Sequence, residues 1–328
     1  MKAPEFWREG GAWPLLLAPA GFLYGLAGRA ERAFTRPQKA SVPVICIGNL
    51  TAGGNGKTPV AIAVAHVLAG AGRIPHFLTR GYGGSAAGPL RVDAKAHGPA
   101  EVGDEALLLA LSEPTWVARD RVAGAKAAAA AGARTVVLDD GFQDPRLAKD
   151  VSLVVADGEA GFGNGRIIPA GPLREDVAGG LRRASALVIV GADRWGVAAL
   201  AARFAPNLPV LTARPEPAPD AARLEATRVY GFAGIGIPEK FLATLREIGA
   251  EVAGFRAFDD HHPYTARDLA LLRSEAAAKG ARLVTTAKDA IRLPADARKE
   301  VDVVEVTARF ADEAALAAVL GISPRTRR

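Results

Sequence analysis

Short apolar runs recur along most of the chain, and alanine-rich stretches with helical spacing separate them. Such runs occur at residues 42–48 (VPVICIG), 134–140 (RTVVLDD), 151–157 (VSLVVAD) and 185–191 (SALVIVG). Apolar runs of this length are typical of strands that are buried on both faces, and the intervening stretches have the length of crossover helices. The alternation therefore predicts right-handed βαβ units, and so an α/β fold with a parallel sheet.

A proline-rich segment interrupts this alternation. Residues 213–222 (ARPEPAPDAA) contain three prolines, and the pattern of strands and helices resumes beyond them. Proline clusters of this kind are typical of linkers. The sequence therefore predicts a larger α/β domain over residues 41–213, a linker over 214–222 and a second, smaller α/β domain over 223–328.

The first 40 residues differ from the rest in charge and hydropathy. They contain six basic and three acidic residues, and 18 uncharged residues run from Gly11 to Gly28. Because this run is shorter than the roughly 20 apolar residues of a spanning helix and contains Pro14 and Pro19, we expect residues 1–40 to form a membrane-associated segment, peripheral or monotopic. Two alternatives are a helix that caps the main domain through its apolar face, and a cleaved secretory signal, which a cytosolic ATP site downstream disfavours.

Composition restricts the chemistry further. The chain has 328 residues, with 41 lysines and arginines against 35 acidic residues, and a single cysteine. The length is sufficient for two domains with cores of their own. One cysteine excludes a disulfide framework and a cysteine metal cluster, and we expect Cys46 in the core because it lies inside an apolar run.

The stretch GNLTAGGNGKTP (residues 48–59) lies between a predicted strand and a predicted helix. It matches the phosphate-binding loop G-x-x-x-x-G-K-[ST], except that Thr51 takes the place of the first glycine. Glycines let backbone N–H groups turn toward phosphate oxygens. We therefore expect an ATP site in which Lys57 approaches the terminal phosphates and the Thr58 hydroxyl binds Mg²⁺. The candidate ATP-binding residues are Thr51, Ala52, Gly53, Gly54, Asn55, Gly56, Lys57 and Thr58.

Two further segments carry candidate ligands for the metal and the phosphates. Asp139 and Asp140 end an apolar run, and we expect both to face Mg²⁺ because the carboxyl ends of parallel strands lie beside such a loop. The glycine- and proline-rich segment 161–175 ends in Arg174 and Glu175. Arg174 is a candidate phosphate clamp and Glu175 a candidate metal ligand, and the alternative is that they form a surface ion pair.

A third cluster, FDDHHPY (residues 258–264), joins two acids and two histidines directly before a predicted helix. A histidine beside carboxylates is a candidate catalytic group. A metal pair is the alternative, although no third and fourth ligand stands at suitable spacing.

In order along the chain, these motifs resemble those of the tetraacyldisaccharide 4'-kinases, the lipid A 4'-kinases. The resemblance extends over residues 40–295 and rests on the stretches GNLTAGGNGKTP, LTRGYGG, GDEALLL, RDRV, LDDGFQ, GNGRIIPAGPLRE, GFAGIG, FDDHHPY and TTAKDAIRL. It implies a large P-loop domain joined to a smaller α/β domain, an active site in the cleft and an N-terminal segment on the inner membrane. It also implies ATP and Mg²⁺ as cofactors, and phosphorylation of the 4'-hydroxyl of tetraacyldisaccharide 1-phosphate, the lipid A disaccharide precursor.

The resemblance assigns further residues. It maps a catalytic aspartate and histidine onto Asp104 and His261, and it makes Arg80 and Gln143 candidate contacts to phosphate or substrate. A carboxylate beside phosphates is a weak base that a nearby imidazole assists. The alternative is structural: His261 caps the helix that begins near Thr265, and Asp104 merely starts a helix.

The expected partners are the lipid precursor and the anionic membrane surface, at the cytoplasmic face of the bacterial inner membrane, with no nucleic acid and no protein partner. The sequence departs from the family pattern at Asp144, where histidine is usual, and at Ile237, where asparagine is usual, and both departures bear on substrate detail. The rival function is a membrane-associated P-loop ATPase switch that controls partner binding. A GTPase is disfavoured because TTAKDA lacks the N-K-x-D spacing.

Overall fold

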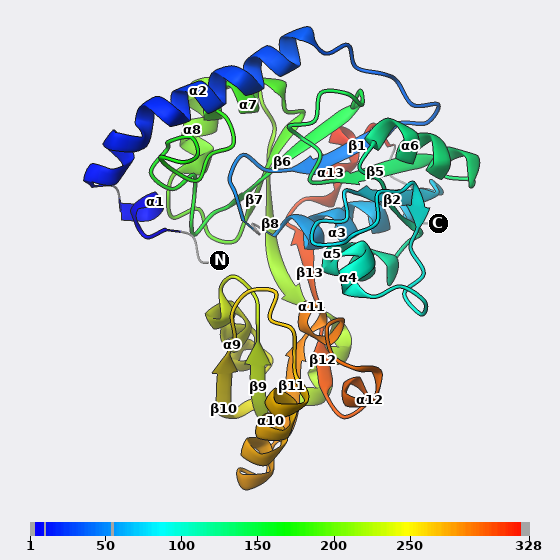
Figure 1. Ribbon diagram of the computed structural model, residues 1–328, viewed down its shortest axis with the longest axis vertical. Coiled ribbons are helices and arrows are strands. Elements are labelled where there is room, and N and C mark those ends of the chain that lie inside the picture. Colours follow the sequence, from blue (N-terminus) through cyan, green and yellow to red (C-terminus); the bar gives the residue numbers. More distant parts are fainter. Residues whose placement is uncertain (1–3, 10, 54–55, 323–328) are drawn as a thin grey trace. The chain divides into compact units, whose positions relative to one another are not determined.

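The protein, here a computed structural model, is described over residues 4–9, 11–53 and 56–322 and divides into two compact units (Figure 1). The larger unit contains the described residues up to Pro215 and those from Ala308 on, and the smaller unit contains Glu216–Thr307. The chain passes from one unit to the other twice, within strand β8 (Val210–Pro217) and within strand β13 (Val306–Phe310).

A nine-stranded sheet forms the centre of the larger unit. In sheet order its strands are β13, β8, β7 (Ala186–Val190), β6 (Val151–Asp157), β1 (Val44–Gly48), β5 (Thr135–Asp139), β2 (Pro75–Thr79), β4 (Thr115–Val117) and β3 (Leu90–Arg91). The neighbours from β8 to β4 pair in parallel, and β3 is antiparallel to β4. Ile47 of β1 lies opposite Asp139 of β5, so the loop after β1 and the aspartates after β5 share one edge of the sheet.

Helices cover both faces of this sheet, which explains why its strands are apolar throughout. Side chains of β1 alternate between the faces: Val44 and Cys46 lie in one core, and Ile45 and Ile47 lie in the other. Cys46 is completely buried, as expected. The helices described in this unit are α1 (Phe6–Glu9), α2 (Ala12–Phe34), α3 (Lys57–Gly70), α4 (Pro99–Val102), α5 (Asp104–Ala110), α6 (Arg121–Ala130), α7 (Val177–Arg183), α8 (Val197–Phe204) and α13 (Glu313–Val319).

The smaller unit repeats the α/β principle with a four-stranded parallel sheet. Its order is β10 (Glu251–Ala257), β9 (Arg228–Ala233), β11 (Arg282–Thr286) and β12 (Asp302–Val304). Apolar residues of α10 (Ala266–Ala278) and α9 (Pro238–Glu247) lie in separate cores on its two faces. The shorter helices are η1 (Pro219–Leu224), α11 (Ala287–Ala290) and α12 (Ala295–Arg298). The expected α/β class is confirmed, with a larger sheet that is mixed but mostly parallel and a smaller sheet that is parallel throughout.

The expected boundaries differ from the structure in two places. The predicted linker over 214–222 is instead the end of β8 followed by η1. Proline is tolerated there because β8 beyond Ala213 is no longer in register with β7, and because Pro219 starts a helix. Residues 308–322, predicted in the smaller domain, return to the larger unit, where Phe310 and Leu316 are buried in the same core as α3.

Helix α2 contains the uncharged N-terminal run. Its buried residues are small or cyclic, namely Pro14, Gly21 and Gly25. Of its large apolar side chains, Leu17 is half-buried and the others are exposed, namely Trp13, Leu15, Leu16, Phe22, Leu23, Tyr24, Leu26 and Phe34. The alternative of a helix that packs through its apolar face is therefore wrong. Over residues 4–9, 11–53 and 56–322, no helix has the length and hydropathy needed to cross a membrane.

Candidate active site

The loop after β1 is held in place by its neighbours. A Cβ at Gly48 would lie 2.5 Å from the Cβ of Phe142, so glycine lets the loop after β5 approach closely. Thr51 is buried and forms a β-bridge with Leu173 of segment 161–175. The residue that replaces the first glycine of the motif therefore has a structural role, which a strand-forming threonine suits.

Lys57 begins α3 and is buried beside the end of β5. Its Nζ donates to the Gly53 carbonyl at 3.1 Å and lies 3.8 Å from Oδ2 of Asp140. Gly54 and Asn55, two of the candidate ATP-binding residues, lie outside the described residues. The other candidates in this loop, Ala52, Gly56 and Thr58, are half-buried.

Asp140 contacts two cations. Its carboxylate accepts hydrogen bonds from both terminal nitrogens of Arg174, at 2.8 and 3.0 Å. Burial alone would raise the pKa of Asp140, but Lys57 and Arg174 outweigh it, and the pKa is lowered. Asp140 is therefore a stable anion that orients both cations. Arg174, the candidate phosphate clamp, is engaged with Asp140.

Asp139, the neighbouring residue, has different surroundings. Its carboxylate is buried, and neither oxygen has a hydrogen-bond partner among the described residues. Burial, followed by the charges of Glu105 and Asp140, raises the pKa of Asp139 to about 8. A buried carboxylate without partners is costly, so its surroundings suit a bound cation.

The predicted Mg²⁺ site can be tested on these contacts. Mg²⁺ usually binds to one or two carboxylates together with substrate phosphates and water. Asp139 and the hydroxyl of Thr58, in the first turn of α3, fit such a site. No three acidic, histidine or cysteine side chains in the described part of the chain could hold a metal by themselves, and this includes the histidine cluster. A cation here therefore needs oxygen ligands from a bound phosphate.

Glu175, a candidate metal ligand, is buried and paired with arginines. Arg183 donates to its Oε2, and Nη2 of Arg32 lies 3.6 Å from the same oxygen. Gln143, a candidate substrate contact, donates from Nε2 to the other oxygen at 3.0 Å. Glu175 and Arg174 thus bind different partners, and the alternative of a surface ion pair between them is wrong.

Asp104 is the buried first residue of α5. Gly103 before it has a φ of 85°, and a Cβ there would lie 2.4 Å from the carbonyl oxygen of Tyr82, so the glycine-rich loop after β2 fixes the start of α5. Glu105 follows Asp104 in α5, and its charge contributes to the raised pKa of Asp139. The start of α5 therefore lies near the end of β5. Arg80 is exposed directly after β2.

Arg121 belongs to the same region, although the sequence assigned it no role. It is buried at the start of α6, its Nη1 donates to the Ala118 carbonyl at 3.3 Å, and its Nε has no partner among the described residues. Burial lowers the pKa of Arg121, and the carboxylates of Asp144 and Asp140 oppose that effect. A buried guanidinium stays charged and needs anions, so Arg121 is a candidate phosphate contact. The sequence signal that points to Arg121 is the motif RDRV, residues 119–122.

The smaller unit presents His261 on a rigid platform. Asp289 is fully buried and accepts from the Gly234 N–H at 2.8 Å and from the Tyr264 hydroxyl at 2.7 Å, while Nη2 of Arg292 lies 3.2 Å from it. The N–H of His261 in turn donates to the Gly234 carbonyl at 3.2 Å. The motifs GFAGIG, FDDHHPY and TTAKDAIRL therefore meet around one buried carboxylate.

The two histidines of the cluster have different surroundings. His261 is exposed, and its Nε2 lies 3.8 Å from Oδ2 of Asp260. His262 stacks on Phe258 and contacts Asp268, as a structural histidine does. Thr265 caps α10 in a capping box, so the alternative that His261 caps this helix is wrong. Asp104 and His261 belong to different units, and their joint role stays a prediction.

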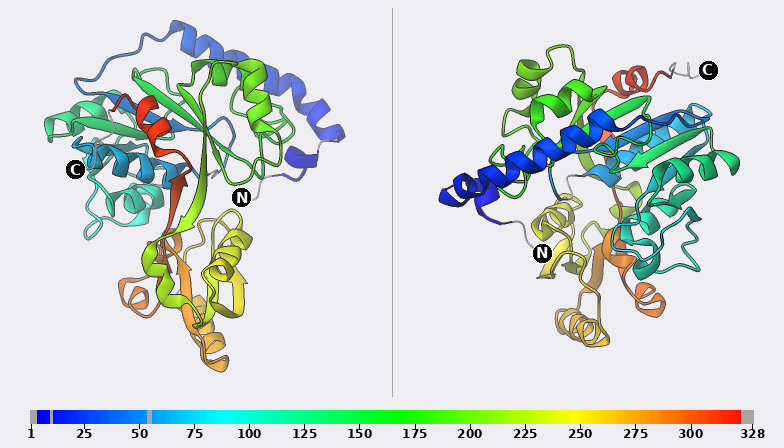
Figure 2. Two further views of the ribbon diagram at one scale, coloured as in Figure 1. Left: turned by 180° about the vertical axis from the view of Figure 1, so that it is seen from behind. Right: turned by 45° about the horizontal axis from the view of Figure 1, so that its top comes forward.

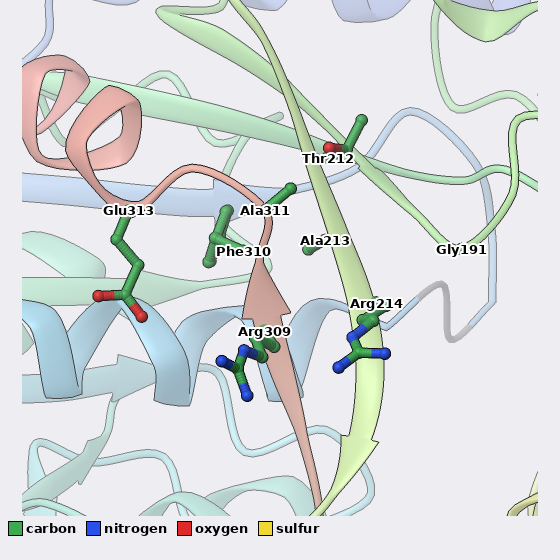
Figure 3. Close-up of a pocket in the computed structure, with 8 residues that line it drawn as sticks. All are labelled: Gly191, Thr212, Ala213, Arg214, Arg309, Phe310, Ala311 and Glu313. Carbon is green, nitrogen blue, oxygen red and sulfur yellow. The ribbon is translucent and has the colours of Figure 1, made fainter. Parts of the chain in front are cut away.

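A hollow of about 650 Å³ lies beside the carboxyl end of β7, next to Thr212–Arg214 in the middle of β8 and to the end of β13. Figure 3 shows the side chains of Arg214, Arg309 and Glu313 around it. Val190, directly before the lining residue Gly191, touches the phosphate loop: a Cβ at Gly56 would lie 3.5 Å from its Cγ1. The hollow is lined by β8, and the phosphate loop follows β1. These two strands are three strand spacings apart in the sheet, which is roughly 14 Å.

A loop of the G-x-G-K-[ST] type after the central strand, beside acidic residues at the end of the next strand, defines a P-loop α/β protein. The family model for tetraacyldisaccharide-1-P 4'-kinase, LpxK, matches residues 13–322, and the chain belongs to this family. It is an enzyme of lipid A biosynthesis that phosphorylates the disaccharide precursor. Membership decides between the kinase and the ATPase switch in favour of the kinase.

Relatives cover nearly the whole chain. The tetraacyldisaccharide 4'-kinase of Rhodospirillum rubrum is 52% identical over 324 residues, which are 98% of this chain and 97% of that protein. The enzyme of Rhodospirillum centenum is 55% identical over 313 residues, 94% and 92% of the two chains. A crystal structure of LpxK from Aquifex aeolicus in complex with ATP has a TM-score of 0.76 at 26% identity, and the match covers 94% of this chain and 99% of that one.

Proposed function

We propose that residues 51–58 bind ATP and that the terminal phosphoryl group moves to the 4'-hydroxyl of tetraacyldisaccharide 1-phosphate. The bond from this phosphorus to the bridging oxygen of ATP breaks, a bond to the sugar oxygen forms, ADP leaves and the hydroxyl proton goes to a base. The observation that carries the proposal is the contrast after β5: an unpartnered Asp139 beside an Asp140 that orients Lys57 and Arg174. Such preorganised charges stabilise the transferring group.

Asp139 and Thr58 would hold Mg²⁺ together with ATP oxygens. The ion would neutralise phosphate charge when bound. Glu175 satisfies its carboxylate with arginines, so we propose that it acts on the site through its neighbours. Arg121 would contribute positive charge to the phosphates from α6.

The base is proposed to be Asp104, assisted by His261. Asp104 begins α5 near Asp139, on the side of the phosphate loop, while His261 extends from the platform around Asp289. A carboxylate in contact with a substrate hydroxyl is a more effective base when a nearby imidazole can take the proton onward as imidazolium. Because the residues lie in different units, assembly of the pair would depend on bound substrate.

The nucleoside of ATP is proposed to occupy the hollow between β7, β8 and β13. Its volume is within the range of small-molecule pockets, and its lining residue Gly191 directly follows Val190, which lies beside Gly56 of the phosphate loop. Glu313 offers an acceptor for ribose hydroxyls, and Arg214 and Arg309 offer faces on which a base can stack.

The exposed face of α2 supports a position at the cytoplasmic face of the inner membrane. Eight large apolar side chains on one helix are an unusual exposed surface for a soluble protein. The lipid substrate keeps its acyl chains in the bilayer, so a helix lying in the interface would bring the site to it. The basic residues around α2 would favour anionic lipid.

The decisive experiment supplies γ-labelled ATP, Mg²⁺ and tetraacyldisaccharide 1-phosphate in detergent micelles. We expect label in the lipid with the wild-type chain and near-complete loss with Lys57→Ala, because the lost ammonium neutralises the transferring group. Lys126→Ala, at an exposed lysine of α6, is the matched control for a lost cation. Transfer by Lys57→Ala at a rate near that of the wild type would remove the loop from the chemistry.

A further inference from the structure

We propose that Arg32 couples helix α2 to the phosphate-binding site, so that membrane binding and nucleotide binding strengthen each other. The inference rests on the proposed function, since it assumes ATP in the loop and lipid at α2. Its basis is a continuous set of contacts that runs from the exposed helix to residues 49–52, where the phosphate loop begins.

The first step is the docking of α2 on segment 161–175. A Cβ at Gly21 would lie 2.7 Å from the carbonyl oxygen of Ile167, and one at Gly25 would lie 2.9 Å from Cδ1 of the same residue. The helix backbone therefore lies directly on the segment, and Figure 2 shows α2 along the outside of the larger unit. The indole of Trp7 in α1 donates to the Pro169 carbonyl at 3.0 Å and ties down the helix preceding α2.

The second step is that the same segment supports the phosphate loop. The Ala52 N–H donates to the Pro172 carbonyl at 2.7 Å, and the Arg174 N–H donates to the Leu50 carbonyl at 2.7 Å. Segment 161–175 thus contacts α2 through one part and the phosphate loop through another. A change in how α2 docks reaches the loop through a single short stretch of chain.

The third step is the polar connection through Glu175. Arg32 of α2 lies 3.6 Å from this carboxylate, whose side chain is only 3% exposed. Gln143 donates to Glu175 at 3.0 Å and to the carbonyl of Asn49 at 2.9 Å, and Asn49 lies two residues before the first candidate ATP-binding residue, Thr51. Removing Arg32 withdraws one of the two cations from a buried carboxylate, which weakens the support of Gln143.

The fourth step is the orientation of α2. The face that carries Gly21 and Gly25 is buried, whereas Leu16 and Phe22 are 70% and 68% exposed. Lipid that covers the apolar face stabilises the docked helix, and the docked helix holds Arg32 against Glu175. Coupling is reciprocal, so bound nucleotide must raise the affinity for lipid by the same factor.

The test measures two affinities on the full chain. The first is the affinity for a non-hydrolysable ATP analogue with Mg²⁺, by calorimetry, with and without vesicles of phosphatidylcholine and phosphatidylglycerol. The second is the affinity for those vesicles, by sedimentation, with and without the analogue. In the wild type we expect both to tighten by the same factor, about fivefold or more.

In Arg32→Ala both factors should fall to about one, while Arg32→Lys should restore them, because a single 3.6 Å ion pair needs charge more than guanidinium geometry. Arg29→Ala is the matched control: its partner Asp176 is the next acid along the chain, but Arg29 is 60% exposed and solvent screens the pair. Gly21→Val, whose Cβ would lie 2.7 Å from the backbone carbonyl oxygen of Ile167, displaces α2 without changing charge. It should also lose the factor, and it serves if Arg32→Ala does not fold.

Equal factors in the wild type and in Arg32→Ala, or a factor of one in the wild type, would overturn the coupling. Phosphate transfer by the wild type on micellar substrate separates this from failure of the proposed function. Transfer without coupling removes only the role of Arg32, whereas absence of transfer removes the function itself.

Discussion

Asp139 and Asp289 are both buried aspartates near the carboxyl ends of parallel strands, one in each unit, and their surroundings are opposite. Asp289 accepts from a backbone N–H, a tyrosine and a threonine, and it pairs with Arg292. Asp139 has no hydrogen-bond partner among the described residues, and its pKa is raised to about 8, chiefly by burial. The first carboxylate is satisfied by the protein, and the second is not.

This difference distinguishes a structural carboxylate, Asp289, from a carboxylate of the candidate active site, Asp139. A buried carboxylate that the fold fully satisfies rigidifies its surroundings, and Asp289 does so for the loop that carries His261. A buried carboxylate that lacks partners destabilises the folded chain, and a bound ligand is one way to offset that cost. The comparison predicts that changing Asp139 harms activity and spares stability, and that changing Asp289 has the reverse order of effects.

The largest effect is expected from Asp139→Asn. Transfer should fall on the order of a hundredfold to a thousandfold, since an amide is a weak ligand for Mg²⁺ and no longer complements its charge. Steady-state rates over a range of Mg²⁺ concentration measure this. Asp93→Asn is a matched control, because that carboxylate is exposed and accepts from the N–H of Lys95 in its own turn.

The same variant has a pH signature. An unfolded carboxyl has a pKa of about 3.9, so between about pH 4 and pH 8 the folded chain binds a proton at Asp139 that the unfolded chain has lost. The free energy of unfolding of the wild type should therefore decline as pH rises through this window. Asp139→Asn should lack that decline and be the more stable protein at pH 8 in the absence of nucleotide. A steeper decline in the variant would contradict the raised pKa.

The next effect concerns Asp104 and His261, which lie in different units. If they act together on the hydroxyl, Asp104→Ala and His261→Ala should each lower kcat by about a hundredfold or more, and the double variant should be little worse than the worse single one. His262→Ala is the neighbouring control. Losses that multiply fully would assign the residues independent roles.

Sequence predicts the strands, the phosphate loop and the pair of acids after β5, because these follow from local apolar runs and from short motifs. It did not separate Asp139 from Asp140, although they are adjacent. Their pKa values move in opposite directions because Lys57 and Arg174 outweigh burial at Asp140, whereas burial dominates at Asp139. The difference in pKa depends on Lys57 and Arg174, which only the tertiary fold brings close to Asp140.

The same limit applies to other residues. The motif makes Glu175 a candidate metal ligand, and its arginine partners in the folded chain, Arg32 and Arg183, come from helices on either side of it in the chain. The sequence does not indicate a role for Arg121, because an arginine at the start of a helix is usually exposed, whereas this one is buried. The sequence predicts strand β13 in the smaller domain, because chain order gives no sign that it returns to the larger sheet.

Asp289→Ala tests the scaffold side of the comparison. It leaves the Gly234 N–H and the Tyr264 hydroxyl without an acceptor and Arg292 without its carboxylate. We expect a loss in the free energy of unfolding of about 3 kcal/mol, measured by urea denaturation. Asp220→Ala is the control in the same unit: its side chain is 65% exposed in an ion pair with Arg223, and its removal should cost less than about 1 kcal/mol. Equal losses in the two variants would contradict the scaffold role.

The smallest effect on chemistry is expected from the outer face of α2, which neither aspartate contacts. Replacing Leu15, Leu16, Phe22 and Leu23 by glutamine keeps the buried glycine face and removes apolar surface that is 63% to 70% exposed. Sedimentation with anionic vesicles should be lost, because each such side chain contributes up to roughly 2 kcal/mol when it is buried in lipid. The KM for vesicle-bound substrate should rise severalfold, while kcat on a soluble analogue should stay within about twofold of the wild type. The control carries Ile74→Gln and Leu111→Gln, which are exposed elsewhere on the larger unit and should leave sedimentation unchanged. If the α2 variant still sediments with vesicles at moderate salt, the membrane contact lies on another surface, and the exposed apolar face of α2 needs a different explanation.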